Sequence, residues 1–253
     1  MRRLLLLVVP FLLVTGCSSS SDDDGGSAAS ASSSSSSAPA ATSGAASPSA
    51  SAGCTAEDAS VPSGADEKQT VDVDGDGRPD QVWISTTPGP DGGVPFGIAT
   101  AAGGVFSATI RSASPVARSV LVADVTGKGE LIALASDGRQ VLLYAISDCA
   151  LVPEQNAQGQ QYAFDLGFTG FGTGVGCVDV DGDGTTDLVG LKYVPEPNGA
   201  GTIERTVIDL DGPRATNGAS DTVTVTRASE AEEAQMVSCG DLTLATDGVT
   251  SGP

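Results

Sequence analysis

The chain has 253 residues, and its 12 Lys and Arg residues stand against 32 Asp and Glu residues, which gives a formal net charge of −20. This excess of negative charge argues against nucleic-acid binding, because phosphate contacts need a basic surface. The sequence contains no His and a single Trp, Trp83. It therefore lacks the commonest general base near neutral pH and has little aromatic surface for stacking on bases.

The N-terminus combines Arg2 and Arg3 with a largely apolar run from Leu4 to Leu13. This run is too short to span a bilayer as a helix, which needs about 20 residues, but it has the length of a signal-peptide core. The following Leu-Val-Thr-Gly-Cys at 13–17 resembles a bacterial lipobox. We therefore expect a lipoprotein signal peptide over residues 1–16 and lipidation of Cys17. An ordinary secretory signal with an incidental Cys is the alternative.

Residues 17–53 consist almost wholly of Ser, Ala, Gly, Pro and Asp after the cysteine. A segment with so little to bury cannot offset the entropy lost on ordering. We predict a disordered tether that links a membrane-bound lipid anchor to a folded domain over residues 54–253. The domain is expected to lie outside the cytoplasm, at the cell membrane.

An Asp-rich pattern occurs twice in this domain, as DVDGDGRPDQV at 72–82 and as DVDGDGTTDLV at 179–189. Carboxylates at alternate positions direct several oxygens at one point, which suits Ca²⁺, and the intervening glycines permit a chain that curls around an ion. Neither loop has the Glu at position 12 of an EF-hand. Asp-Gly turns with solvated charge are the alternative.

Each predicted calcium site has four side-chain ligands and one carbonyl ligand. In the first loop these are Asp72, Asp74, Asp76 and Asp80 with the carbonyl of Arg78, and in the second Asp179, Asp181, Asp183 and Asp187 with the carbonyl of Thr185.

The Asp-rich pattern belongs to a longer repeat. A degenerate copy begins at Asp124 and a weaker one at Asp241, so that the four lead aspartates are 52, 55 and 62 residues apart. Such periods are typical of repeated supersecondary units. The copy at Asp124 has Thr126 and Lys128 in ligand positions. The Lys128 ammonium could occupy the place of the ion, so we predict that this loop binds none.

Between the loops, short apolar runs separated by turn signals predict β strands. Expected strands include 81–85, 95–101, 105–111, 131–134, 140–146, 187–193, 202–210 and 222–227. No stretch has a sustained helical period, although 230–235 is compatible with one or two helical turns. The sequence therefore predicts an all-β domain whose units have three to four strands each, as in the blades of a propeller.

The loops resemble those of FG-GAP and VCBS repeats, which form the β-propeller of integrin α subunits and occur in many bacterial surface proteins. The best match is FGTGVGCVDVDGDGTTDLVG at 171–190, although the Gly-Ala-Pro element of the family is missing after Gly190. The resemblance implies a small or partial β-propeller with calcium loops. The chain has room for about three to four blades, where the family usually has about seven, so both a four-bladed ring and an open arrangement are considered.

The domain contains four cysteines: Cys54, Cys149, Cys177 and Cys239. An even number in an exported domain suggests two disulfides, whereas zinc is disfavoured because no CxxC spacing is present. Three pairings are possible. We favour Cys54–Cys239, which would join the two ends of the domain, together with Cys149–Cys177.

The expected function is that of a cell-envelope lipoprotein that presents a calcium-stabilised repeat domain for protein or glycan binding. No enzyme is expected, because the sequence has no GxSxG, Ser/His/Asp or HExxH arrangement. A structural envelope protein without a specific ligand is the alternative. A hydrolase that acts on envelope polysaccharide through paired carboxylates is a further one.

Overall fold

The computed structural model describes residues 53–55, 59–167, 172–197 and 201–252. The predicted signal peptide, Cys17 and nearly all of the predicted tether lie outside these residues. The described residues form β strands and a single short helix, α1 (Ala228–Glu233), so the all-β prediction is confirmed. None of the helical structure described is long and apolar enough to cross a membrane.

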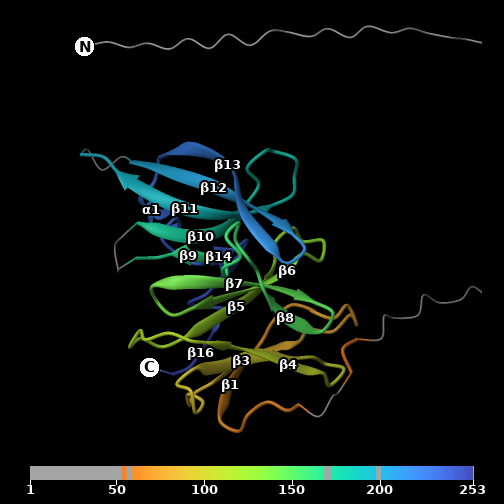
Figure 1. The fold of residues 1–253 in the computed structure, drawn as a ribbon. Coiled ribbons are helices and arrows are strands. Elements are labelled where there is room, and N and C mark those ends of the chain that lie inside the picture. Colours follow the sequence, from red (N-terminus) through yellow and green to blue (C-terminus); the bar gives the residue numbers. More distant parts are fainter. Residues whose placement is uncertain (1–52, 56–58, 168–171, 198–200, 253) are drawn as a thin grey trace, which may run out of the picture. The chain divides into compact units, whose positions relative to one another are not determined.

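Three antiparallel sheets are each built on four consecutive strands (Figure 1). The first sheet contains, in order, β1 (Ala65–Gln69), β2 (Gln81–Ser85), β3 (Val94–Ala99) and β4 (Val105–Ile110). The second contains β5 (Ser119–Asp124), β6 (Leu131–Ser136), β7 (Gln140–Ser147) and β8 (Ala150–Pro153), with β16 (Val249–Thr250) added beside β5 and β9 (Ala163–Asp165) beside β7. The third contains β10 (Thr173–Val178), β11 (Asp187–Pro195), β12 (Gly201–Asp211) and β13 (Arg214–Val225).

The three sheets repeat one connection, in which an Asp-led loop joins the first strand to the second. The loop that starts at Asp72 lies between β1 and β2, the loop of Asp124 between β5 and β6, and the loop of Asp179 between β10 and β11. The repeat predicted from the lead aspartates is therefore present in three copies. The weak fourth copy at Asp241 differs, because it lies in the turn between two short strands, β14 (Ser238–Cys239) and β15 (Leu242–Thr243).

The second sheet is buried on both of its faces. Even-numbered residues of β5, such as Val120 and Val122, join a core with Phe96 and other residues of the first sheet, where Phe96 meets Tyr144 edge-to-face with ring centroids 5.3 Å apart. The odd-numbered Leu121 points into a second core, which it shares with the third sheet. That core contains Ile132, Leu134, Leu143, Val175, Leu188 and Ile208. Burial on both faces explains the nearly continuous apolar sequence of β5 and β6.

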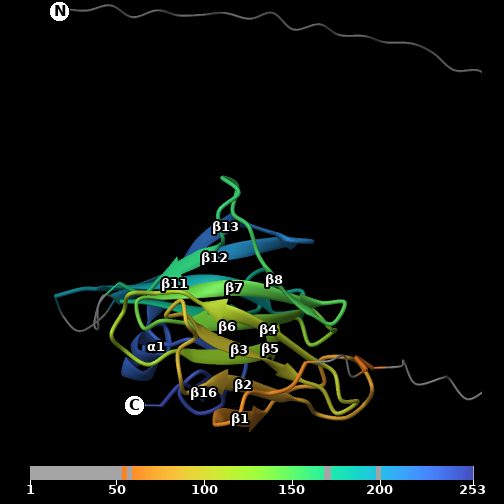
Figure 2. The same ribbon diagram turned by 60° about the horizontal axis from the view of Figure 1, so that its bottom comes forward.

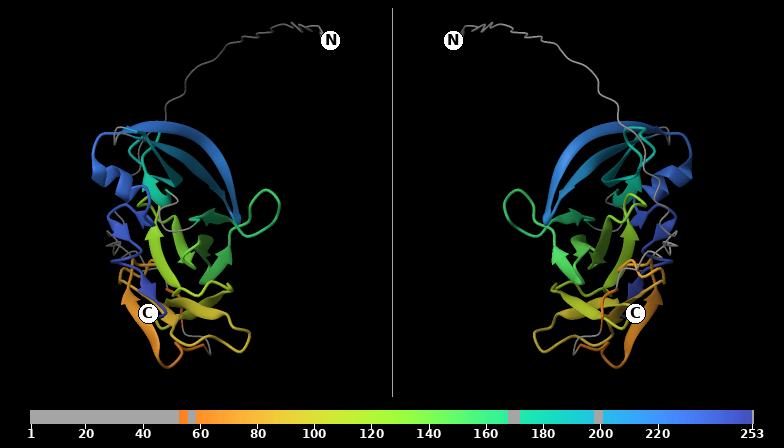
Figure 3. Two further views of the ribbon diagram at one scale, coloured as in Figure 1. Left: turned by 90° about the vertical axis from the view of Figure 1, so that its left-hand side faces the viewer. Right: turned by 90° about the vertical axis from the view of Figure 1, so that its right-hand side faces the viewer.

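The C-terminal segment runs past the first strands of all three sheets. Its strand β16 pairs with β5, Val237 forms a bridge with Val175 of β10, and Lys68 of β1 donates a hydrogen bond to the carbonyl of Thr246. Figures 2 and 3 show this segment in blue beside strands from much earlier in the chain. Because an unpaired strand edge is a template for association with another chain, the segment protects edges that would otherwise be open.

The four cysteines form two disulfides, as predicted, but the favoured pairing is wrong. Cys54 bonds to Cys149 and Cys177 bonds to Cys239, with Cα–Cα separations of 5.7 and 4.4 Å. The reason is the path of the C-terminal segment, which returns Cys239 on β14 to the edge of β10. The backbone of Cys54 is held instead at the β3–β4 turn, where its carbonyl accepts a hydrogen bond from Gly104 N–H at 2.9 Å.

Glu154, just after β8, is a carboxylate inside the folded domain. It is 1% exposed, and its Oε2 has no hydrogen-bond partner within the described part of the chain. Burial, with a smaller contribution from the charge of Glu130, raises the pKa of Glu154 to about 7. Between pH 4.5 and about 7 the folded chain therefore holds a proton on Glu154 that the unfolded chain releases. The free energy of unfolding is highest below pH 4.5 and falls as the pH rises to about 7.

Glu154→Gln should remove this pH dependence. The difference in free energy of unfolding, variant minus parent, should increase by about 3 kcal/mol from pH 4.5 to pH 8. Urea unfolding in the presence of a calcium chelator measures it. Glu67→Gln is the matched control, because Glu67 is an exposed glutamate on β1. Parallel pH profiles for Glu154→Gln and the parent would contradict the expectation.

Candidate metal centres

The first Asp-rich loop is folded around the side chain of its lead aspartate. Asp72 Oδ1 accepts a hydrogen bond from Gly75 N–H and Oδ2 accepts one from Gly77 N–H, both at 2.8 Å. The two glycines have φ of 72° and 86°. Any residue with a Cβ atom would be strained in this left-handed region, whereas glycine is not. One carboxylate thus satisfies two turn donors and fixes the curl of the loop before any ion is considered.

Two further aspartates tie this loop to other parts of the domain. Asp74 Oδ2 accepts from Cys54 N–H at 2.8 Å, next to the Cys54–Cys149 disulfide. Asp80 is fully buried and accepts from Val73 N–H at 2.7 Å and from Ala101 N–H at 2.8 Å. The loop is therefore held at both ends by backbone donors that the sequence pattern did not reveal.

The structure brings three of the four predicted side-chain ligands of the first loop together. Carboxylate oxygens of Asp72, Asp74 and Asp80 lie within 4.8 Å of one another. Asp76 is outside this group, because its carboxylate accepts a hydrogen bond from Arg78 Nε at 3.0 Å. The Arg78 side chain holds the pKa of Asp76 below its usual range. Arg78 was predicted to contribute its carbonyl to the ion; in the structure its guanidinium and its backbone N–H both donate to Asp76.

The second Asp-rich loop repeats the same backbone pattern. Asp179 accepts from Gly182 N–H at 2.7 Å and from Gly184 N–H at 3.0 Å, which matches the bonds of Asp72 position by position. Asp187 accepts from Val180 N–H at 3.1 Å, as Asp80 does from Val73. Two sequence-identical stretches of the loops thus fold in the same way in different sheets.

The carboxylates that converge in the second loop are not the same set. Oxygens of Asp179, Asp181 and Asp183 lie within 4.8 Å of one another, and Asp187 is outside the group. Thr185 replaces Arg78 at the equivalent position, so no guanidinium draws Asp183 away. The Thr185 N–H donates to Asp183 at 2.7 Å. The carbonyls of Thr185 and Arg78 stay predictions as ligands.

The donor chemistry of both clusters fits a hard divalent cation. Each offers three carboxylates, and Ca²⁺ takes six to eight oxygen ligands that include carboxylates, carbonyls and water. Burial raises the pKa of Asp80, and the charges of Asp74 and Asp72 raise it further. A bound cation would relieve this cost by pairing the closely held negative charges.

The middle loop keeps the fold without the cluster. Asp124 accepts from Gly129 N–H at 2.7 Å, the bond that Asp72 makes with Gly77. The Lys128 ammonium forms no ion pair with Asp124; it donates to Thr185 Oγ1 in the neighbouring loop at 2.7 Å. The ammonium therefore does not occupy the ion position of its own loop, because the close approach of the two loops offers it a different partner. That the middle loop binds no ion stays a prediction.

Comparison with protein-family models, with curated proteins and with solved structures found no match to this chain. The resemblance to FG-GAP and VCBS repeats therefore depends on the loop residues themselves.

Asp80 and Asp187 occupy equivalent positions but should differ in their effect on stability. In a chelator, Asp80→Ala should lower the free energy of unfolding by about 2–3 kcal/mol, because it leaves the N–H groups of Val73 and Ala101 without an acceptor in a buried place. Asp187→Ala removes one acceptor and should cost about 1 kcal/mol. Urea unfolding measures both.

Asp80→Asn serves as the control for shape, since it keeps one acceptor oxygen and should recover part of the loss. Equal destabilisation by Asp80→Ala and Asp187→Ala would show that the extra contact to Ala101 contributes nothing.

Proposed function

We propose that this chain is a lipid-anchored protein of the cell envelope whose domain is a calcium-stabilised partial β-propeller that presents a surface for protein or glycan binding. The observation that carries the proposal is the placement of two matching acidic loops at the same connection of two sheets, each with three converging carboxylates. Asp-Gly turns without a ligand would not need this convergence.

The partial propeller has three blades in this proposal, one for each four-stranded sheet. Antiparallel four-stranded sheets in consecutive order are the unit of propeller folds, and the resemblance of residues 171–190 to FG-GAP and VCBS repeats supports the same reading. The C-terminal segment would take the place of further blades, because it pairs with β5 and bridges to β10.

Calcium in this proposal has a structural role. Loops of extracellular modules bind calcium with dissociation constants of about 10⁻⁴–10⁻³ M, and an ion at ten times its dissociation constant adds about 1.4 kcal/mol per site. The sites would thus stiffen loops that are already folded by Asp72 and Asp179. Binding of a protein or glycan, and the absence of catalysis, remain predictions.

Calcium titration of the full-length chain by calorimetry should detect two sites. Asp74→Ala should remove the first and Asp181→Ala the second, because each takes one carboxylate from a cluster of three. Asp66→Ala is the control and should leave both sites, since Asp66 is an exposed aspartate of β1 that belongs to neither cluster. A parent chain that binds no calcium would end the metal part of the proposal.

The anchor has a separate test in bacteria that express the chain. An alkyne-tagged palmitate fed to the cells should label the parent and the control Ser18→Ala, whereas Cys17→Ser should lose the label, because the thiol that accepts the lipid is gone. Equal labelling of Cys17→Ser and the parent would refute lipidation at Cys17.

A further inference from the structure

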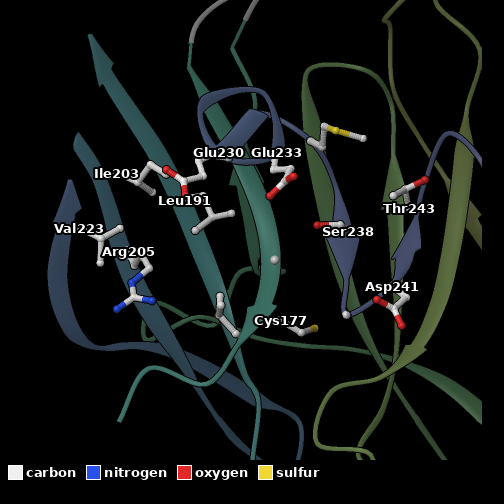
Figure 4. Close-up of a pocket in the computed structure, with 15 residues that line it drawn as sticks. Cys177, Leu191, Ile203, Arg205, Val223, Glu230, Glu233, Ser238, Asp241 and Thr243 are labelled. Carbon is white, nitrogen blue, oxygen red and sulfur yellow. The ribbon is translucent and has the colours of Figure 1, made fainter. Parts of the chain in front are cut away.

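A groove of about 540 Å³ lies on the third sheet, and its lining ends at Val178, one residue before the second acidic loop (Figure 4). Its walls are α1, the face formed by β11, β12 and β13, and the C-terminal segment from Met236 to Thr243. This volume falls within the range of about 300–1,000 Å³ that is usual for ligand sites. None of the predicted calcium ligands lines it.

The floor of the groove is apolar. Leu191, Ile203 and Val223 come from three neighbouring strands, and Ile203 pairs directly with Val223. The same side chains belong to a small core that continues beneath α1, where Ala234 is buried. The helix therefore covers one end of an apolar strip and leaves the rest accessible from the groove.

The charged groups at the groove are predominantly acidic and are not balanced by neighbouring cations. Arg205 is matched, because its Nε donates to Asp221 at 2.7 Å. Glu233 on α1 and Asp241 in the β14–β15 turn form no ion pair with any residue that the structure describes. Figure 4 shows Glu233 between the apolar side chains and Asp241, which lies on the side of the groove away from Leu191, Ile203 and Val223.

Glu230 adds a third carboxylate beside Glu233. It accepts hydrogen bonds from the N–H groups of Thr226 and Arg227 at 2.7 and 3.0 Å, and these lower the pKa of Glu230 to about 2. This carboxylate is ionised throughout the neutral range. Its partner Arg227 has a largely exposed side chain, so solvent weakens the charge compensation that Arg227 provides.

The groove is also covalently braced. Cys177 lines it from β10, and the Cys177–Cys239 disulfide joins β10 to the adjacent strand β14. The disulfide fixes the position of β14 beside β10 and so restricts the movement of this part of the lining. A site that is already ordered loses less conformational entropy when a ligand binds.

We propose that this groove binds a short extended peptide segment of a partner protein, in which a Lys or Arg stands next to apolar side chains. The apolar floor contacts the apolar side chains of the peptide, and the carboxylates on α1 and at Asp241 pair with its Lys or Arg. The lining runs from Val223 on β13 to Asp241 and Thr243, so a ligand that contacts both the apolar side chains and Asp241 has to be extended, which suits a peptide. This assignment rests on the proposed binding function and names its site and its class of partner.

The test is a fluorescence-anisotropy titration of the full-length chain with the labelled peptide Leu-Lys-Leu-Arg-Leu, in calcium. The double variant Glu233→Gln/Asp241→Asn should weaken binding at least tenfold. The matched control Asp66→Asn/Glu67→Gln makes the same change of charge at exposed residues of β1 and should change binding less than twofold. Thermal unfolding checks that both variants are folded.

Three results would overturn the inference. The first is an equal loss of affinity in both double variants, and the second is equally tight binding of Leu-Glu-Leu-Glu-Leu. The third is displacement of the labelled peptide by hexylammonium at the same concentration as by unlabelled peptide, which would make the groove a site for small amines. Failure of the calcium titration with peptide binding intact would remove the metal proposal alone. Intact calcium binding without peptide binding would remove this inference alone.

Discussion

The second sheet has no face toward solvent, and the positions of the other two sheets follow from this. Alternate residues of β5 point in opposite directions, so Val120 and Leu121 must each find apolar partners on different sides. Apolar burial contributes roughly 25 cal/mol for each Å² removed from water, so both sides have to be covered. The first sheet covers one side and the third sheet the other, and the Asp-led loops are carried to their places by the strands that make these contacts.

Folding of the loops and convergence of carboxylates are separable properties. The lead aspartate organises each loop by accepting backbone N–H groups, and Asp124 does so in a loop with no cluster. The remaining aspartates therefore are not needed to form the turn. Their presence at matching positions in two loops, where close negative charges oppose one another, is what the proposed calcium sites would explain. The first cluster is more strongly fixed, because Asp80 is buried and Asp74 is tied to Cys54.

Local pattern predicted the loops and the strands β2–β4, β6, β7 and β11–β13, but it did not predict β1, β5 and β10, which precede the loops. Contacts between distant segments were outside its reach. The strand at 81–85 and the helical turns near 230 were anticipated, but β13 begins at Arg214, eight residues before the predicted 222, because polar residues mask a long edge strand. The cysteine pairing depends on where residues 237–252 run, and no periodic signal encodes that path. The approach of Lys128 to Thr185 and of Cys54 to Asp74 likewise joins residues 57 and 20 positions apart.

The outer face of the third sheet connects the fold with the proposed binding role. In a closed propeller, a face of this kind packs against the next blade and is lost to ligands. Here α1 and the C-terminal segment cover part of it and leave the apolar strip of Leu191 and Val223 in one groove with Glu233 and Asp241. Neither of these carboxylates has an ion-pair partner in the part of the chain that the structure describes. An apolar strip alone would favour self-association, but like charges on its rim oppose the approach of a second acidic copy. The same charges favour a basic ligand. The proposed groove therefore exists because no further four-stranded sheet covers this face of the third sheet.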